Sequence, residues 1–307
     1  MSRSVRLCPT AYQRDARGAV VSLLIGLHLL ASGCGDGNDF NPDLLAVEFA
    51  ADAFVTVGED YAIANSADGG DFLVQSAGCC GALHALSFGD GIWFTGGGDG
   101  VVFTSTDTAN WFVQFLNTGK TLRGAAFGTA TYVLVGDEGQ AFSSTNAGAW
   151  ASEDTGTTER LEDVVFAAGQ FVTVGDAGTI LISADGSMWT AQASGTATDL
   201  FGVGSGAGLL IAVGEEGTIL TSGDGMTWTE QAAPTTEDLQ EVVHANGLFV
   251  IVGNRGVILT SPDGVTFTEQ DSGTQRDLSG ITFGEGLFVA VGRDAKILNS
   301  TDGITWP

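Results

Sequence analysis

The sequence predicts an all-β fold in which seven four-stranded antiparallel sheets close into a ring. Three observations support this. One pattern of residues recurs every 39 positions, short apolar runs alternate with turn residues, and 46 of the 307 residues are glycine. This glycine share is about twice the average of ~7% and indicates many tight turns. Residues 44–307 are therefore expected to form a seven-bladed β-propeller.

The repeat is clearest at a serine that precedes each turn. Leucine, glycine and aromatic columns keep the same spacing, beginning at Leu44, Gly58 and Phe72. The serine column consists of Ser66, Ser105, Ser144, Ser183, Ser222, Ser261 and Ser300. Four columns that stay in phase over seven copies indicate a repeat architecture.

Each copy contains four strand-like runs. In the sixth copy they are Leu239–Val243, Leu248–Val252, Gly256–Thr260 and Val265–Glu269, separated by short segments rich in Gly, Asn and Asp. Such connections suit hairpins and leave no room for helices. A sheet of this kind cannot bury both faces alone, so the copies must stack.

The seventh copy is shorter than the others, so its outermost strand is expected to be incomplete. Residues 38–41 are a candidate for pairing there and latching the ring. The alternative is that residues 34–43 form a free tether.

The first 33 residues are typical of a secretory signal peptide. Arginines precede an apolar run at residues 19–31 that is too short to span a bilayer, and small residues follow it. The segment ending at Cys34 resembles a bacterial lipoprotein signal, which implies lipidation of Cys34. Gly35 after the cysteine resembles the pattern for transfer to the outer membrane. The alternative is an ordinary cleavable signal. We therefore expect an exported protein held by a lipid at the bacterial cell envelope.

The turn between the third and fourth strands resembles a known motif. Ser183–Trp189, Ser222–Trp228 and Ser300–Trp306 are similar to the Asp-box, or bacterial neuraminidase repeat, of propellers such as sialidases and photosystem II assembly-factor-like proteins. This sequence has one residue fewer between Asp and Trp, and its second and third copies are degenerate. The aspartates are expected to accept backbone hydrogen bonds within the turn, because a role repeated in every blade is structural. They are Asp68, Asp107, Asp185, Asp224, Asp263 and Asp302.

The charge balance excludes several partners. The chain has a net charge of −26 and a pI of about 4.1. It lacks the basic surface that nucleic acids require, and anionic membranes would repel it, so membrane association is expected only through the lipid anchor. Basic proteins and cations are the favoured ligands, and a divalent cation is a candidate.

Acidic residues are expected to gather around one mouth of the channel. They lie in the turns after the glycine column and in the links before the leucine column, which share one face of a propeller. The alternative is that these acids only maintain solubility. The twelve residues are Asp43, Glu59, Asp60, Asp99, Asp137, Glu138, Asp176, Asp199, Glu215, Glu216, Asp238 and Asp277.

The sequence offers no recognisable catalytic or metal motif. The arginines fall at scattered positions of the repeat, which argues against a sialidase site. His84 and His244 lie in different blades, and His244 occupies a column otherwise filled by phenylalanine. No catalytic residue, metal site or resident cofactor is predicted.

Cys79 and Cys80 are adjacent in the link between the first two copies. An exported compartment favours a strained vicinal disulfide between them. The alternatives are free or intermolecularly paired thiols, and a soft-metal site completed by His84.

Two classes of function remain. The first is a non-enzymatic binding or assembly scaffold, acting as a monomer, whose acidic face binds a basic protein or a cell-envelope component. The alternative is a carbohydrate-active enzyme, a glycoside hydrolase or lyase, with acids such as Asp99, Asp137 and Glu138 at the channel mouth.

Overall fold

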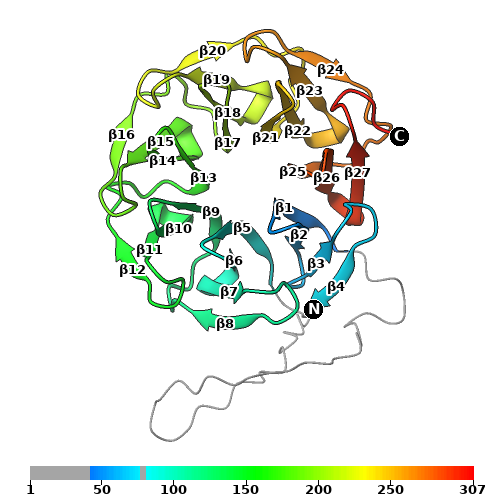
Figure 1. The fold of residues 1–307 in the computed structure, drawn as a ribbon. Coiled ribbons are helices and arrows are strands. Elements are labelled where there is room, and N and C mark those ends of the chain that lie inside the picture. The colour runs from blue at the N-terminus through cyan, green and yellow to red at the C-terminus, as the bar shows by residue number, and fades with distance from the viewer. Residues whose placement is uncertain (1–41, 77–80) are drawn as a thin grey trace, which may run out of the picture.

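The chain forms a ring of seven β-sheets around a central channel (Figure 1). This computed structural model describes residues 42–76 and 81–307. Each sheet is one antiparallel blade whose strands follow the order of the chain from the channel outward, as the sequence predicts. The seventh blade has three strands in the described part of the chain.

The strands of each blade are as follows. Blade 1 contains β1 (Leu44–Ala50), β2 (Ala53–Gly58), β3 (Ile63–Ser66) and β4 (Leu73–Ser76). Blade 2 contains β5 (Leu83–Gly89), β6 (Ile92–Gly97), β7 (Val101–Ser105) and β8 (Phe112–Phe115). Blade 3 contains β9 (Leu122–Gly128), β10 (Thr131–Gly136), β11 (Ala141–Ser144) and β12 (Ala151–Glu153). Blade 4 contains β13 (Leu161–Ala167), β14 (Gln170–Gly175), β15 (Thr179–Ser183) and β16 (Thr190–Gln192).

The other three blades repeat this plan. Blade 5 contains β17 (Leu200–Gly206), β18 (Leu209–Gly214), β19 (Ile219–Ser222) and β20 (Thr229–Gln231). Blade 6 contains β21 (Leu239–Ala245), β22 (Leu248–Gly253), β23 (Ile258–Ser261) and β24 (Thr268–Gln270), and blade 7 contains β25 (Leu278–Gly284), β26 (Leu287–Gly292) and β27 (Lys296–Ser300). Short 3₁₀ turns follow the second strand of blades 2 to 7: η1 (Gly98–Gly100), η2 (Asp137–Gly139), η3 (Asp176–Gly178), η4 (Glu215–Gly217), η5 (Asn254–Gly256) and η6 (Arg293–Ala295).

The outer strand of blade 6 begins later than the sequence predicts. The expected run started at Val265, whereas β24 starts at Thr268. The Asp263 carboxylate accepts hydrogen bonds from the backbone N–H groups of Val265 and Thr266, at 2.9 and 2.8 Å. These bonds hold both residues in the turn, so the sheet ladder begins after it.

The same turn recurs in the other blades. In blade 5 the Ser222 hydroxyl accepts a bond from the N–H of Gly225, and Asp224 accepts from the N–H groups of Met226 and Thr227. The Trp228 indole donates to the Gly225 carbonyl at 3.0 Å. Hydrogen bonds to the ionised carboxylate lower the pKa of Asp224. The pKa is lowered in the same way in Asp68, Asp107, Asp185, Asp263 and Asp302.

The core lies between neighbouring blades. Trp228 of blade 5 packs with Val172 and Val174 of blade 4, and Trp306 of blade 7 packs with Val250 of blade 6. Each interface buries one face of two sheets, which a single blade could not do by itself. The ring therefore depends on every blade having two neighbours.

Glycines allow the inner strands of neighbouring blades to approach closely. A Cβ placed on Gly89 would lie 2.0 Å from Cγ of Phe127 in the next blade. Gly206 faces His244 in the same way, with a hypothetical Cβ only 2.1 Å from Cγ of the imidazole. His244 packs on Phe249 with ring centroids 4.4 Å apart, as the phenylalanines of this column do with their own neighbours.

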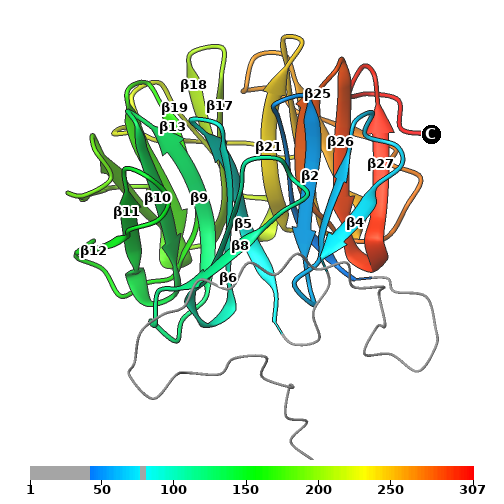
Figure 2. The same cartoon turned by 60° about the horizontal axis from the view of Figure 1, so that its bottom comes forward.

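Blades 7 and 1 close the ring (Figures 1 and 2). The Asp43 carboxylate accepts a bond from the N–H of Asp294 at 2.8 Å, and the Pro42 carbonyl accepts from Ala295 at 2.9 Å. The N–H of Phe49 donates to the hydroxyl of Thr282. The latch predicted for residues 38–41 lies outside the described residues. Within the described part of the chain, no helix has the length and apolar character needed to cross a bilayer.

Candidate functional site: the central channel and its mouth

Four of the predicted ligand acids hold the blades together. Each of these four aspartates precedes an inner strand and lies beside the 3₁₀ turn of the preceding blade. Asp199 accepts a bond from the N–H of Ala177 at 2.8 Å. Asp238, Asp277 and Asp43 make the equivalent bonds to Glu216, Arg255 and Asp294.

These bonds fall where the backbone is strained. Each aspartate accepts its hydrogen bond from the N–H of the central residue of the turn. The backbone φ of that residue is positive, for example 53° at Ala177 and 55° at Glu216. Non-glycine residues seldom adopt this conformation. The aspartate column therefore supports the turns and joins consecutive blades, so these carboxylates are partly committed to the scaffold.

Three more of the predicted acids are paired with basic residues. Asp137 contacts Arg123 at 2.6 Å, Asp176 contacts Arg160 at 3.1 Å, and Glu138 pairs with Lys120. Burial favours a raised pKa for Asp137, but the hydrogen bond and charge of Arg123 hold the pKa of that carboxyl below its ordinary value. Each of these ion pairs joins the turn of one blade to the start of its own inner strand or to the link that precedes it.

Glu162 connects the two arginines of this network. Its two carboxylate oxygens contact Arg123 at 3.2 Å and Arg160 at 3.0 Å. Burial nevertheless raises the pKa of Glu162. Both arginines are thus paired with carboxylates, as Lys120 is, so the described residues of this arc of the mouth include no unpaired basic group.

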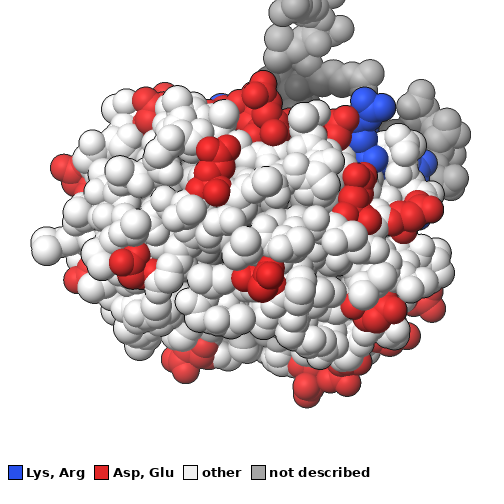
Figure 3. All heavy atoms as spheres, turned by 90° about the horizontal axis from the view of Figure 1, so that it is seen from above, with Lys and Arg blue, Asp and Glu red and all other residues white. Residues whose placement is uncertain are grey.

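The remaining five predicted acids are exposed and have no side-chain hydrogen bond or ion pair within the described part of the chain. Three lie in the adjoining turns of blades 1 and 2, and two lie in the turn of blade 5. They are Glu59, Asp60, Asp99, Glu215 and Glu216. Acidic residues also occur on the sides of the molecule, so acidity is not confined to the mouth (Figure 3).

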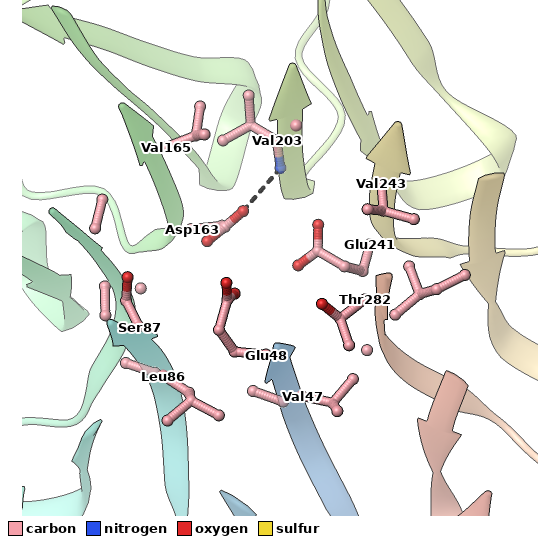
Figure 4. Close-up of a pocket in the computed structure, with 18 of the residues that line it drawn as sticks. Val47, Glu48, Leu86, Ser87, Asp163, Val165, Val203, Glu241, Val243 and Thr282 are labelled. Carbon is pink, nitrogen blue, oxygen red and sulfur yellow. Dashed lines mark hydrogen bonds between the residues drawn. The ribbon is translucent and has the colours of Figure 1, made fainter. Parts of the chain in front are cut away.

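The inner strands enclose a cavity of about 760 Å³ along the channel. Glu48 of β1, Asp163 of β13 and Glu241 of β21 project into it and toward one another (Figure 4). All three residues are half-buried, because protein packs closely around them while the channel leaves them partly accessible to water. We call these three residues the channel triad.

The pKa values of the channel triad are raised because its three carboxyls are buried close to one another. Burial, reinforced by the charge of Asp163, raises the pKa of Glu48 to about 7. Burial also raises the pKa of Asp163 to about 7, although the N–H of Val203 donates to its Oδ2 at 2.9 Å. Burial and the neighbouring carboxyls raise the pKa of Glu241 well above its usual range.

His84 lies on the wall of the same cavity, near Arg123. Burial and the charge of Arg123 lower its pKa to about 4, so its imidazole is neutral at physiological pH. Within residues 42–76 and 81–307, no group of three or more His, Cys, Asp or Glu side chains has the arrangement of a metal site. Cys34, Cys79 and Cys80 lie outside the described residues.

The channel triad was not among the predicted site residues, yet the repeat contains a signal for it. Asp163 and Glu241 stand two positions after the leucine column, where the other copies have glycine or alanine. Glu48 stands four positions after it, where the other copies have Ser, Ala, Val, Gly or Thr. An acid in one of these inner-strand columns faces the channel and breaks the repeat.

Comparison with known proteins supports the fold. Residues 116–235 match a family described as the DUF6242 beta propeller domain. No curated protein matches the chain. A structure described as YCF48 bound to D1 peptide is similar with a TM-score of 0.69 and 16% identity, over 84% of this chain and 93% of that one.

Two further solved structures have the same overall shape. YCF48 from Cyanidioschyzon merolae gives a TM-score of 0.68 at 16% identity, covering 86% of this chain and 97% of that one. The WD40 beta propeller domain of Doa1 gives a TM-score of 0.68 at 12% identity, covering 85% of this chain and 93% of that one. At these identities the likeness establishes a β-propeller that resembles YCF48 in architecture.

Proposed function

We propose that this protein is a non-enzymatic binding scaffold whose channel mouth binds a basic segment of a partner protein. The observation that carries the proposal is the division among the acids of this face. Most are committed to backbone N–H groups or to basic side chains, whereas Glu59, Asp60, Asp99, Glu215 and Glu216 are exposed without side-chain partners among the described residues. Exposed charges of one sign steer and hold ligands of the opposite sign.

The resemblance to YCF48 supports a protein partner. The YCF48 structure contains a D1 peptide, so a propeller of similar shape holds a polypeptide segment in that case. The surface of the present chain favours basic segments, because its net charge is −26. The signal-like N-terminus adds the proposal that the scaffold is lipid-anchored at Cys34 on the bacterial cell envelope.

The test is binding of a fluorescent oligolysine peptide to the full chain, with oligoglutamate as the control ligand. Replacing both Glu215 and Glu216 with Gln should weaken binding several-fold, at about 0.5 kcal/mol for each exposed charge. The matched control replaces Glu230 and Glu269 with Gln. These residues are exposed acids on outer strands β20 and β24, away from the mouth.

The salt dependence of oligolysine binding distinguishes this electrostatic mechanism from apolar binding. Raising the salt from about 0.05 to about 0.5 M should weaken oligolysine binding markedly, because exposed charges are screened. Equal losses in the mouth and outer-strand variants would show that net charge alone attracts the peptide and would contradict a site at the mouth. Turnover of a glycoside that depends on Asp99 or Asp137 would instead favour the enzymatic alternative.

A further inference from the structure

We propose that the channel triad binds a primary alkylammonium group, supplied either by a lysine side chain or by a free alkylamine. The ammonium would lie among Glu48, Asp163 and Glu241, with its alkyl stem along the channel wall. This site is separate from the exposed acids of the mouth. It does not depend on the proposed protein partner, because a small amine suffices to occupy it.

The first support is the convergence of three acids from distant parts of the chain. They come from blades 1, 4 and 6 and point toward a common region of the cavity (Figure 4). The repeat does not require them, since the other copies have small or apolar residues at the same positions. Burying carboxyls together is unfavourable unless a cation or protons balance their charge.

The second support is the hydrogen bonding of the triad. Glu48 has no hydrogen bond or ion pair within the described residues, although protein surrounds it and it points into the cavity. Asp163 uses one oxygen to accept the N–H of Val203, and Glu241 uses one to accept the N–H of Val242. Glu241 has a second carboxylate oxygen for which the described residues supply no hydrogen bond, whereas the Asp163 carboxyl also accepts from the backbone N–H of Val164. The triad therefore has more acceptor oxygens than the backbone N–H donors that the described residues supply to it.

An ammonium group satisfies this arrangement better than the other common cations. It is compact and carries three N–H donors, one for each carboxylate, whereas guanidinium is planar and suits two-pronged pairing with a single carboxylate. Val165, Val203, Val243 and Leu86 line the cavity beside the triad (Figure 4). An alkyl stem could bury its methylene groups against these side chains while its charged end reaches the acids.

The other charged or titratable groups that line the described part of the channel form no ion pair with the triad. β5 contributes His84, β9 contributes Arg123, β13 contributes Glu162 and β21 contributes His244, while β17 and β25 contribute only uncharged side chains to the cavity. Arg123 is paired with Asp137 and Glu162. Binding should therefore strengthen as the pH rises through the range in which the triad loses protons.

The test is a titration of the full chain with n-butylamine at pH 8, followed by calorimetry and NMR. n-Butanol is the control ligand, because it has the same stem without the charge. We expect saturable binding of the amine and none of the alcohol. Glu48→Gln and, independently, Glu241→Gln should weaken amine binding about tenfold, as expected for loss of a charge-assisted hydrogen bond. Glu230→Gln, on the outer strand β20, should not alter it.

Two results would overturn the proposal: no saturable amine binding by the folded wild-type chain at pH 8, or equal binding by the wild type and both triad variants. Both variants remove a buried charge and are expected to fold, which their melting curves will show. Tighter binding of Nα-acetyl-lysine amide than of n-butylamine would identify a lysine side chain as the source, and the reverse order would identify a free amine; the Nε-acetylated form lacks the charge and should not bind. The oligolysine assay on Glu215 and Glu216 reports separately on the proposed function.

Discussion

Replacing Glu48 with Gln should stabilise the protein at pH 8 and have little effect at pH 5. The structure raises the pKa of this carboxyl from 4.5 to about 7, chiefly by burial. At pH 8 the native state must hold the ionised form in a place that disfavours it. Each pKa unit corresponds to about 1.4 kcal/mol, so the shift corresponds to about 3 kcal/mol. Water in the channel screens the charge of the half-buried Glu48, so the destabilisation is at most this large.

The direction of the pH dependence follows from proton binding. Between pH 4.5 and about 7, Glu48 holds more protons in the folded chain than in the unfolded chain. The free energy of unfolding therefore falls as the pH rises through this window and levels off above it. Asp163 contributes in the same direction, since its pKa also rises to about 7. The wild type should lose more stability between pH 5 and pH 8 than Glu48→Gln does.

Thermal melts followed by circular dichroism would measure this difference. For a domain of this size, 1 kcal/mol corresponds to roughly 2 °C in Tm, so Glu48→Gln should melt up to about 6 °C higher than the wild type at pH 8. Glu230→Gln, an exposed acid on β20, controls for the loss of one negative charge. If Glu48→Gln is destabilised equally at both pH values, Glu48 is a structural acceptor and the reasoning is wrong.

Three further predictions concern the scaffold. Asp302→Ala should lower the Tm at pH 7, and its difference in Tm from the wild type should vanish as the pH falls toward 2. The turn holds the pKa of Asp302 at about 2, so the stabilisation by the carboxylate is lost when that group is protonated. Thermal melts from pH 2 to 7 would measure the difference in Tm. Asp43→Ala should cost about 1 kcal/mol by removing the acceptor for the N–H of Asp294, and urea unfolding would detect this weakening of ring closure. Gly89→Ala should cost about 1–3 kcal/mol, because its Cβ would collide with Phe127, and a chain as stable as the wild type would contradict the close packing described.

The fold was predictable from the sequence because each blade repeats the same physical solution. The turn from Ser222 to Trp228 carries its own hydrogen-bond acceptors and its own packing residue, so its spacing alone indicates the blade. The start of β24 was placed too early because apolar Val265 was assigned to a strand. Hydrogen bonding to Asp263 keeps that residue in the turn, and hydrophobic patterning does not register such a bond.

The candidate site was only partly predictable. The prediction grouped acids by the face on which they lie, but it could not separate Asp199, which supports a turn, from Glu216, which is exposed in one. That distinction depends on hydrogen bonds between blades, such as the one from Ala177 to Asp199, and these join residues that are far apart in the sequence. Glu48 was missed because a single acid within an apolar strand resembles a tolerated exception until the ring places it opposite Asp163.

Periodicity offers a way to separate scaffold from site in this chain. Asp43, Asp199, Asp238 and Asp277 share one column and the same bond to a neighbouring turn, so their recurrence reflects a need common to the blades. A ring of equivalent blades has no preferred direction across its channel, and a ligand that is not itself sevenfold must be held by residues that break the equivalence. Glu48, Asp163 and Glu241 break it inside the channel, in columns where the other copies have small, hydroxyl-bearing or apolar side chains. The repeated acids are explained by their role in the scaffold. The charge of the three unrepeated acids must instead be balanced by a cationic ligand or by bound protons.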